Sequence, residues 1–174
     1  MSMSTSSAKH KAEAAKIRSI PVALVTVSDS RTEETDKNAQ YLREHLTALG
    51  HIISSYHLIK DDPQAIERVL EEICHTEARI VLINGGTGIA PRDTTFDVVS
   101  RRLEKVLPGF GELFRVFSYE EVGAAAMLSR AVAGIYRQRV VFSMPGSPNA
   151  VWLAWTKLIE PELNHLAWEV VREH

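Results

Sequence analysis

The chain has 174 residues, 45% of them hydrophobic, which is enough for one well-packed domain and short for two. Its 20 basic and 22 acidic side chains give a formal charge of −2 with no run of like charges, which argues against a nucleic-acid or polybasic membrane partner. Cys74 is the only cysteine, so an internal disulfide and a thiolate metal site are excluded and a reducing compartment is favoured.

The sequence carries no membrane signal. No apolar stretch approaches the roughly 20 residues of a membrane helix, and the N-terminus lacks the apolar segment of a signal peptide. We therefore expect a cytoplasmic protein without a membrane partner. Residues 1–18 are small, polar or helix-prone without an apolar face, so we expect a flexible N-terminal tail followed by a single domain over residues 19–174.

The first predicted element is a strand. Residues 21–27 are continuously apolar and rich in β-branched side chains, which is typical of a strand buried on both faces of a parallel sheet, and the run stops at Ser28. Four apolar residues then recur at the spacing of one helical face: Ala39, Leu42, Leu46 and Leu49. Gly50 ends that pattern as a helix stop would.

A second strand and helix follow. Residues 51–60 have mixed polarity, which predicts a strand nearer a sheet edge, and Asp61 comes directly after it. Asp62 suits the N-cap and Pro63 the first position of the next helix. The apolar face of this helix is formed by Ile66, Val69, Leu70 and Ile73.

The remaining elements alternate in the same way. Residues 80–83 predict a third strand that leads into a glycine-rich turn, and residues 94–103 predict a helix. The pattern between 108 and 130 is helical but contains three glycines, so we expect two short helices there. Strands are expected over 131–136 and 140–144. Ser147 as N-cap then begins a long helix that Pro161 interrupts.

Alternating strands and helices predict an α/β fold, a three-layer α/β/α sandwich with a mostly parallel sheet. In such folds ligands bind beyond the carboxyl ends of the strands. Four segments that could bear chemistry each follow a predicted strand and should therefore converge: Ser28-Asp29, Asp61-Asp62, Gly85–Asp93 and Pro145–Asn149.

The glycine turn is the strongest single signal. Gly85, Gly86, Thr87 and Gly88 follow a buried apolar run, and glycines at such a point allow backbone N–H groups to surround an oxyanion. No Gly-Lys-Ser/Thr follows, so the turn is not a Walker loop, and the first strand lacks a dinucleotide fingerprint. Carboxylates beside a phosphate would repel it unless a divalent cation lay between them.

Asp61 and Asp93 are therefore predicted together as Mg²⁺ ligands or neighbours on a phosphorylated substrate. A purely structural interpretation stays open for each polar residue. Asp93 is equally explained as a cap of the next helix, although Thr94 or Thr95 would also serve. Asp61 could be an exposed loop acid, Ser28 and Asp29 an ordinary turn, Ser147 only a cap, and Glu112 an acid that favours a helix N-terminus.

Several motifs together resemble the molybdenum cofactor biosynthesis family, which includes molybdopterin adenylyltransferases. The resemblance covers about residues 20–159 and rests on six segments: 26–29, 58–61, 81–93, 108–112, 128–130 and 144–148. It is most similar to the B branch of that family. The resemblance implies that the terminal phosphate of molybdopterin attacks the α-phosphate of Mg-ATP, giving adenylylated molybdopterin and pyrophosphate.

The same resemblance assigns residues. Asp61 and Asp93 match the two functional aspartates of the family, and Gly85 to Gly88 match its loop for pterin phosphate and nucleotide. Other matching positions line the pocket in the family: Ser28, Asp29, Gly146 and Ser147. Arg130 also matches a motif, and either a ligand or a structural acid is open as its partner. Relatives form trimers or hexamers, so a homotrimer or homohexamer is expected.

The resemblance also implies a second function. The B branch contains active members and inactive ones that resemble binding or assembly proteins. The segment Pro145–Ala150 lacks the glutamine and lysine that follow Pro-Gly in many members of the adenylyltransferase branch. A non-catalytic molybdopterin-binding protein is therefore the alternative to an adenylyltransferase, and a general nucleotide-binding module is the third hypothesis.

Overall fold

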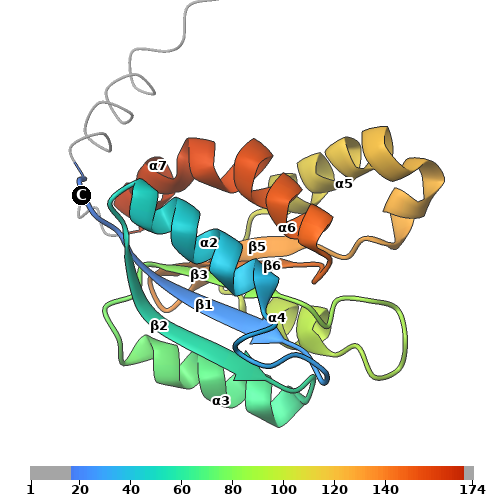
Figure 1. Ribbon diagram of the computed structural model, residues 1–174, viewed down its shortest axis with the longest axis horizontal. Coiled ribbons are helices and arrows are strands. Elements are labelled where there is room, and N and C mark those ends of the chain that lie inside the picture. Colours follow the sequence, from blue (N-terminus) through green and yellow to red (C-terminus); the bar gives the residue numbers. More distant parts are fainter. Residues whose placement is uncertain (1–16, 171–174) are drawn as a thin grey trace, which may run out of the picture.

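The computed structural model describes residues 17–170, and its centre is a six-stranded sheet in the order β2-β1-β3-β6-β5-β4 (Figure 1). Four strands are parallel: β1 (Pro21–Val27), β2 (Ile52–Ile59), β3 (Ile80–Asn84) and β6 (Arg139–Met144). β5 (Val132–Tyr136) runs antiparallel to β6 and to the two-residue edge strand β4 (Lys105–Val106). The predicted mostly parallel sheet is confirmed, with β2 at one edge as its mixed polarity indicated.

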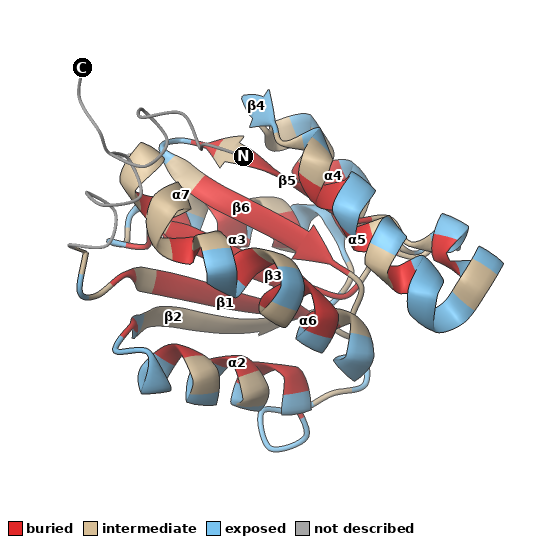
Figure 2. Cartoon of the chain, turned by 90° about the horizontal axis from the view of Figure 1, so that it is seen from above, coloured by how far each residue is buried: buried red, intermediate tan, exposed pale blue. Residues whose placement is uncertain are grey.

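Helices cover both faces of this sheet, which confirms the three-layer sandwich. On one face, α2 (Lys37–Ala48), α5 (Pro108–Val122), α6 (Pro148–Ala154) and α7 (Leu163–Glu169) pack over alternate strand residues such as Leu24 and Leu82. On the other face, α3 (Pro63–Cys74) and α4 (Thr95–Arg102) pack over Val25 and Ile83. β1, β3 and β6 are therefore buried from both sides, as Figure 2 shows.

The segment between 108 and 130 differs from the prediction of two short helices. A single 15-residue helix, α5, runs from Pro108 through both early glycines, and a short 3₁₀ segment, η1 (Gly123–Leu128), follows it. Gly109 and Gly111 lie in the first turns, and Gly111 allows close packing, since a Cβ there would stand 2.5 Å from the Ala131 carbonyl oxygen. Of these three glycines, only Gly123, with φ 62°, ends a helix.

Two further details of the predicted helices are corrected. Leu49 was placed on the apolar face of the first helix, but it lies just beyond the end of α2 and is 46% exposed. The last long helix changes before Pro161, through a π-helical turn η2 (Trp155–Ile159) and a 3₁₀ turn η3 (Glu160–Glu162), before α7 begins. Proline has no N–H to donate to the fourth residue before it, so the preceding turn rearranges.

The expected N-terminal tail lies mostly outside the described residues, because residues 1–16 are not among them. Ile17 is described and packs, half-buried, against the core. None of the helices between residues 17 and 170 is both long and apolar enough to cross a lipid bilayer.

Candidate functional site

A cavity of about 460 Å³ opens at the carboxyl ends of the central strands. Because β1 lies between β2 and β3 in the sheet, the chain leaves β1 toward one edge and returns to build the sheet toward the other, and this is the place where open α/β sheets bind ligands. The walls come from the segments after β1, β3 and β6 and from the end of η1: Val27, Ser28, Ser30, Arg31, Asn84, Gly85, Gly86, Thr87, Gly88, Leu128, Ser129, Pro145 and Gly146.

Glycines allow these loops to meet without side chains between them. Gly85 has φ 102°, and a Cβ there would overlap the carbonyl oxygen of Val27 and stand 3.1 Å from its carbon. A Cβ on Gly146 would stand 2.9 Å from the Gly85 Cα. The glycine-rich turn therefore lies directly against the ends of β1 and β6, and its backbone forms one wall of the cavity.

The structure brings six of the ten predicted site residues to the cavity wall: Ser28, Gly85, Gly86, Thr87, Gly88 and Gly146. Asp29, Asp61, Asp93 and Ser147 do not line it. Asp61 and Asp93 nevertheless lie against the glycine turn. The segments after β1, β3 and β6 meet at the cavity as predicted, whereas the Asp61-Asp62 segment after β2 does not line it.

Asp61 supports the turn and the start of α4. Its Oδ1 accepts hydrogen bonds from the Thr94 backbone N–H (3.1 Å), the Thr94 hydroxyl (2.7 Å) and the Thr95 hydroxyl (3.4 Å). Its Oδ2 lies against Gly86, where a Cβ would overlap it. Asp61 thus has a structural role that the sequence left unassigned, since it provides the first turn of α4 with an acceptor from another loop.

Asp93 does not cap α4. Its Oδ2 accepts a hydrogen bond from the Ala90 backbone N–H at 3.0 Å and lies against Gly88, where a Cβ would overlap it. Within the described part of the chain no hydrogen bond reaches its Oδ1. Asp29 forms an ion pair with Arg92 and accepts a weak hydrogen bond of 3.4 Å from the Asp61 backbone N–H.

Both serines in the predicted set have clear local roles. The Ser28 hydroxyl accepts hydrogen bonds from the backbone N–H groups of Ser30 (3.3 Å) and Arg31 (3.2 Å), as in an ordinary turn, and Ser28 also lines the cavity. The Ser147 hydroxyl accepts from the Ala150 N–H at 3.2 Å and caps α6. The structural interpretation of Ser147 as a cap is therefore confirmed.

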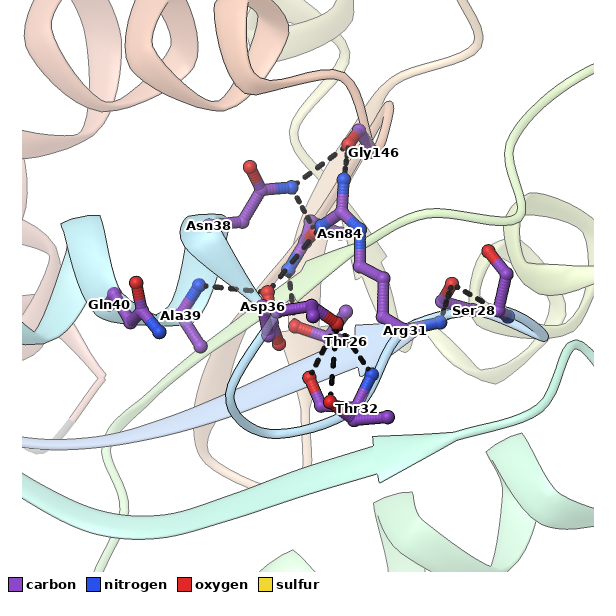
Figure 3. A network of polar contacts seen from close by, with 12 residues as sticks. Thr26, Ser28, Arg31, Thr32, Asp36, Asn38, Ala39, Gln40, Asn84 and Gly146 are labelled. Carbon is purple, nitrogen blue, oxygen red and sulfur yellow. Dashed lines mark hydrogen bonds and ion pairs between the residues drawn. The ribbon is translucent and has the colours of Figure 1, made fainter.

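Arg31 is the only charged residue among those that line the cavity. Its guanidinium donates to the Gly146 carbonyl oxygen at 2.9 Å and lies 3.4 Å from the Asp36 carboxylate (Figure 3). The side chain remains 23% exposed. The sequence showed Arg31 only as the residue after a strand-end turn, so its place as the cavity's cation was missed.

A buried polar network holds Arg31 and the loop after β6 in place. Asp36 is fully buried, caps α2 through the Ala39 N–H at 3.1 Å and accepts a hydrogen bond of 2.8 Å from the Tyr56 hydroxyl. Burial, and then the hydrogen bond to Asp36, raises the pKa of Tyr56 well above its ordinary value, so Tyr56 remains a neutral donor.

Two asparagines extend this network across the sheet. The Asn38 amide donates to the side-chain oxygen of Asn84 (2.7 Å) and to the Gly146 carbonyl (2.9 Å). The Asn84 amide in turn donates to the Val25 carbonyl and the Thr26 hydroxyl. Because these bonds link α2 and the ends of β1 and β3 to the loop after β6, the network fixes the relative positions of three cavity walls.

The two residues whose roles were open are also placed. Arg130 pairs with a structural acid, Asp97, through two contacts of 3.1 Å, and with backbone carbonyls of the glycine turn. Glu112 is exposed on α5, in the wall of a shallow depression away from the cavity. Of the two partners that the sequence leaves open for Arg130, a ligand or a structural acid, the structure shows the acid.

The carboxylates beside the turn are ligands of the kind that oxygen-binding divalent cations such as Mg²⁺ prefer. Mg²⁺ binds oxygen atoms and is commonly held by one or two carboxylates together with substrate phosphates. No cluster of three or more His, Cys, Asp or Glu side chains suited to a metal ion occurs within residues 17–170. Asp61 and Asp93 bring two carboxylates against one glycine turn, and this pair suits Mg²⁺ held jointly with a phosphorylated ligand, not a cage built by protein alone.

Comparison with known proteins gives consistent matches over nearly the whole chain. The family model described as "Probable molybdopterin binding domain" matches residues 23–165. Molybdenum cofactor biosynthesis protein B of Bacillus cereus is 50% identical over 167 residues, which cover 95% of this chain and 98% of that protein. The protein of the same name from Bacillus subtilis is 46% identical, with 95% and 97% covered.

Solved structures agree with this result. A crystal structure of a molybdenum cofactor biosynthesis protein B has a TM-score of 0.86 at 48% identity and covers 91% of this chain and 100% of its own. The tungsten cofactor synthesizing protein MoaB from Pyrococcus furiosus has a TM-score of 0.79 at 38% identity, with 90% and 99% covered. The family match over residues 23–165 includes every residue that lines the cavity.

Proposed function

The chain belongs to the molybdopterin-binding domain family and acts in molybdenum cofactor biosynthesis, and on that premise we propose that it binds molybdopterin and adenylylates it with Mg-ATP. In this reaction an oxygen of the terminal phosphate of molybdopterin forms a bond to the α-phosphorus of ATP. The bond from that phosphorus to the oxygen bridging to the β-phosphate breaks, and pyrophosphate leaves. The proposal rests chiefly on the cavity, whose wall combines a glycine turn with a single arginine.

Phosphoryl-type transfer requires mainly that the reacting groups be positioned and their charge neutralised. The glycine turn offers backbone N–H groups to a phosphate, and Arg31 offers a guanidinium that Asp36 and Gly146 already hold in place. Asp61 and Asp93 would hold Mg²⁺ beside the turn, and the ion would supply further neutralisation of phosphate charge.

The test is a turnover assay with molybdopterin and Mg-ATP. We expect the wild-type protein to form adenylylated molybdopterin and pyrophosphate in equal amounts. Asp93→Asn keeps an acceptor for the Ala90 N–H but removes the charge, so we expect its rate to fall by about a hundredfold or more, as when a charge-stabilising group is lost. Asp62→Asn is the matched control, because Asp62 caps α3 and asparagine caps equally well.

A second function is favoured by a specific observation. Neither Asp61 nor Asp93 lines the cavity, and both carboxylates accept hydrogen bonds from the turn beside it. A protein that uses these acids only to shape the turn would bind molybdopterin without catalysis. Wild-type protein that binds molybdopterin but forms no ATP-dependent product would establish that function and contradict the adenylyltransferase.

We also propose that the chain forms a homotrimer or homohexamer. α5 and η1 present exposed apolar side chains that no described element covers, among them Val116 (56% exposed), Tyr119 (64%), Val122 (53%) and Met127 (80%). Such a surface on a small domain marks a contact with another chain. Arg115 and the acids Glu112 and Glu120 border a shallow depression of about 520 Å³ on the same helix, so charges of both signs are available to a second copy.

A further inference from the structure

Arg130 lies directly after Ser129, a residue of the cavity wall, but does not line the cavity itself. A guanidinium carries its N–H donors on three nitrogens, and here each nitrogen contacts protein acceptors. Nε donates to the Thr87 carbonyl (3.0 Å), and Nη2 donates to the carbonyls of Gly88 (2.6 Å) and Asp93 (3.3 Å). Nη1 donates to both carboxylate oxygens of Asp97 at 3.1 Å. All three nitrogens of Arg130 are therefore engaged by protein groups.

These contacts fix the direction of the peptide groups in the turn. No peptide bond in the described chain is cis, so each N–H points opposite to the carbonyl of the preceding residue. With the Thr87 and Gly88 carbonyls bound to Arg130, the N–H groups of Gly88 and Ile89 point away from Arg130. The Gly86 carbonyl accepts a hydrogen bond from the Thr95 N–H at 3.0 Å, so the Thr87 N–H, on the opposite side of that peptide, points away from Thr95.

The N–H groups on the other side are unpaired. Among residues 17–170 no acceptor is found for the backbone N–H of Gly86, Thr87, Gly88 or Ile89, although neighbouring N–H groups at Gly85, Ala90, Asp93 and Thr94 all have one. Thr87 is only 4% exposed, and a buried N–H without a partner is costly. Gly86, Thr87 and Gly88 line the cavity whereas Ile89 and Arg130 do not, so three of the four unpaired N–H groups belong to residues of the cavity wall.

We propose that Arg130 is a positioning residue that orients the Gly88 and Ile89 N–H groups, so that the consecutive unpaired N–H groups from Gly86 to Ile89 form a binding nest for a phosphate group in the cavity. The proposal rests on the proposed function in taking the anion to be the phosphate of the pterin or of the nucleotide. Consecutive N–H groups that point to one side are a known arrangement for binding phosphate. Arg130 acts from behind, by engaging the carbonyls that would otherwise be free to rotate toward the ligand.

The surroundings of Arg130 require an arginine. Its guanidinium is held by the Asp97 carboxylate and stacks over the Phe96 ring at 4.8 Å, and both residues belong to α4. A lysine has three donors on a single nitrogen and cannot reach carbonyls and a carboxylate in opposite directions. Arg130→Lys therefore keeps the positive charge near Asp97 and removes the planar contacts that orient the turn.

The first measurement needs no ligand. Hydrogen exchange resolved to short peptides should show faster exchange in Arg130→Lys for the amides of Ala90, Asp93, Thr94 and Thr95, whose bonds depend on the shape of the turn. Exchange of the β1 and β3 amides should not change. Arg102→Lys is the matched control, because Arg102 lies at the end of α4, pairs with Glu67 at 3.0 Å and has no contact with the turn.

The second measurement uses inorganic phosphate, AMP and adenosine as probes. Phosphate and AMP should slow exchange of the Gly86–Ile89 amides in the wild type, and AMP should bind more tightly than adenosine. In Arg130→Lys we expect this preference for AMP to fall about tenfold, the change associated with one hydrogen bond to a charged group. Asp97→Asn weakens the ion pair with Arg130 and does not alter a residue of the cavity wall, so it should also lower the preference for AMP, by a smaller factor. A parallel pair, molybdopterin and its dephosphorylated form, identifies whether the phosphate belongs to the pterin.

Each outcome decides the proposal. Weaker AMP binding with unchanged exchange at Ala90–Thr95 would make Arg130 a direct ligand contact and overturn positioning. An unchanged preference for AMP, or a wild-type turn that gains no protection from phosphate or AMP, would overturn the nest. If Arg130→Lys fails to fold, Asp97→Asn alone answers both measurements. Failure of adenylyl transfer in the wild type would leave the exchange and affinity results intact, so the two proposals fail separately.

Discussion

Gly86→Ala is the sharpest test of how tightly the glycine turn is built. Gly86 has φ 64°, where a side chain costs about 1–2 kcal/mol. The added Cβ would overlap the Thr95 hydroxyl oxygen and Asp61 Oδ2 and would stand 2.8 Å from Asp61 Cγ. Asp61 must then move, and the hydrogen bonds it accepts from Thr94 and Thr95 weaken, at about 1 kcal/mol for each bond lost. We expect the free energy of unfolding to fall by about 2–4 kcal/mol.

Two other glycines separate the causes. Gly50 also has a positive φ, 82°, but its added Cβ would meet only the Arg18 carbonyl oxygen at an ordinary contact distance of 3.6 Å, so Gly50→Ala should cost only the conformational term of about 1–2 kcal/mol. Gly109 has neither restriction and lies in a helix, so Gly109→Ala should be neutral or stabilise by up to about 1 kcal/mol. Urea unfolding of the three variants, with AMP binding measured on each, gives the comparison. A Gly86→Ala protein as stable as Gly50→Ala would refute the close packing of Asp61 against the turn.

Three further predictions concern separate parts of the molecule. Arg31→Gln removes the only charged residue of the cavity wall, so in calorimetry it should weaken AMP binding by tenfold or more and leave adenosine binding nearly unchanged. Arg43→Gln, which removes a charge outside that wall, is the control. Val116→Asp should shift the oligomer toward smaller species in light scattering, whereas Gln64→Asp, at an exposed position of α3, should not. Burial lowers the pKa of His51, so the folded state resists protonation of this side chain. Stability measured by thermal unfolding should therefore fall as the pH drops below the pKa of histidine in the unfolded chain, about 6.5. His51→Asn should flatten that part of the pH profile.

The parts of the fold that could be predicted are those with a strong local pattern. β1, β3 and β6 are buried from both faces, so their sequences are nearly continuous apolar runs and stand out without any knowledge of the fold. Because parallel strands end at one edge of the sheet, the sequence predicts that the segments after them lie close together, and the glycine turn does line the cavity as predicted. β4 has two exposed residues and no such pattern, and it was missed.

The parts of the site that could not be predicted depend on contacts between distant residues. Arg31 meets Gly146 across 115 positions, and Asn38 meets Asn84 across 46. Neither pair has a local pattern, because the contacts exist only once β3 lies between β1 and β6. Asn84 did carry a weak signal, as a polar residue at the end of an apolar strand, and a buried amide needs partners. The strand order decides which partners it finds.

Asp61 shows why loss of activity after an alanine substitution would not separate a chemical role from a structural one. All three hydrogen bonds that it accepts from Thr94 and Thr95 end on Oδ1, while Oδ2 lies against Gly86. Asparagine can keep the Oδ1 bonds and removes only the charge and Oδ2, whereas alanine removes everything. If the carboxylate only supports the turn, Asp61→Asn should bind molybdopterin and turn over as the wild type does, with Asp61→Ala impaired and less stable. If it holds Mg²⁺ with the phosphates, Asp61→Asn should be as inactive as Asp61→Ala while its stability stays near that of the wild type.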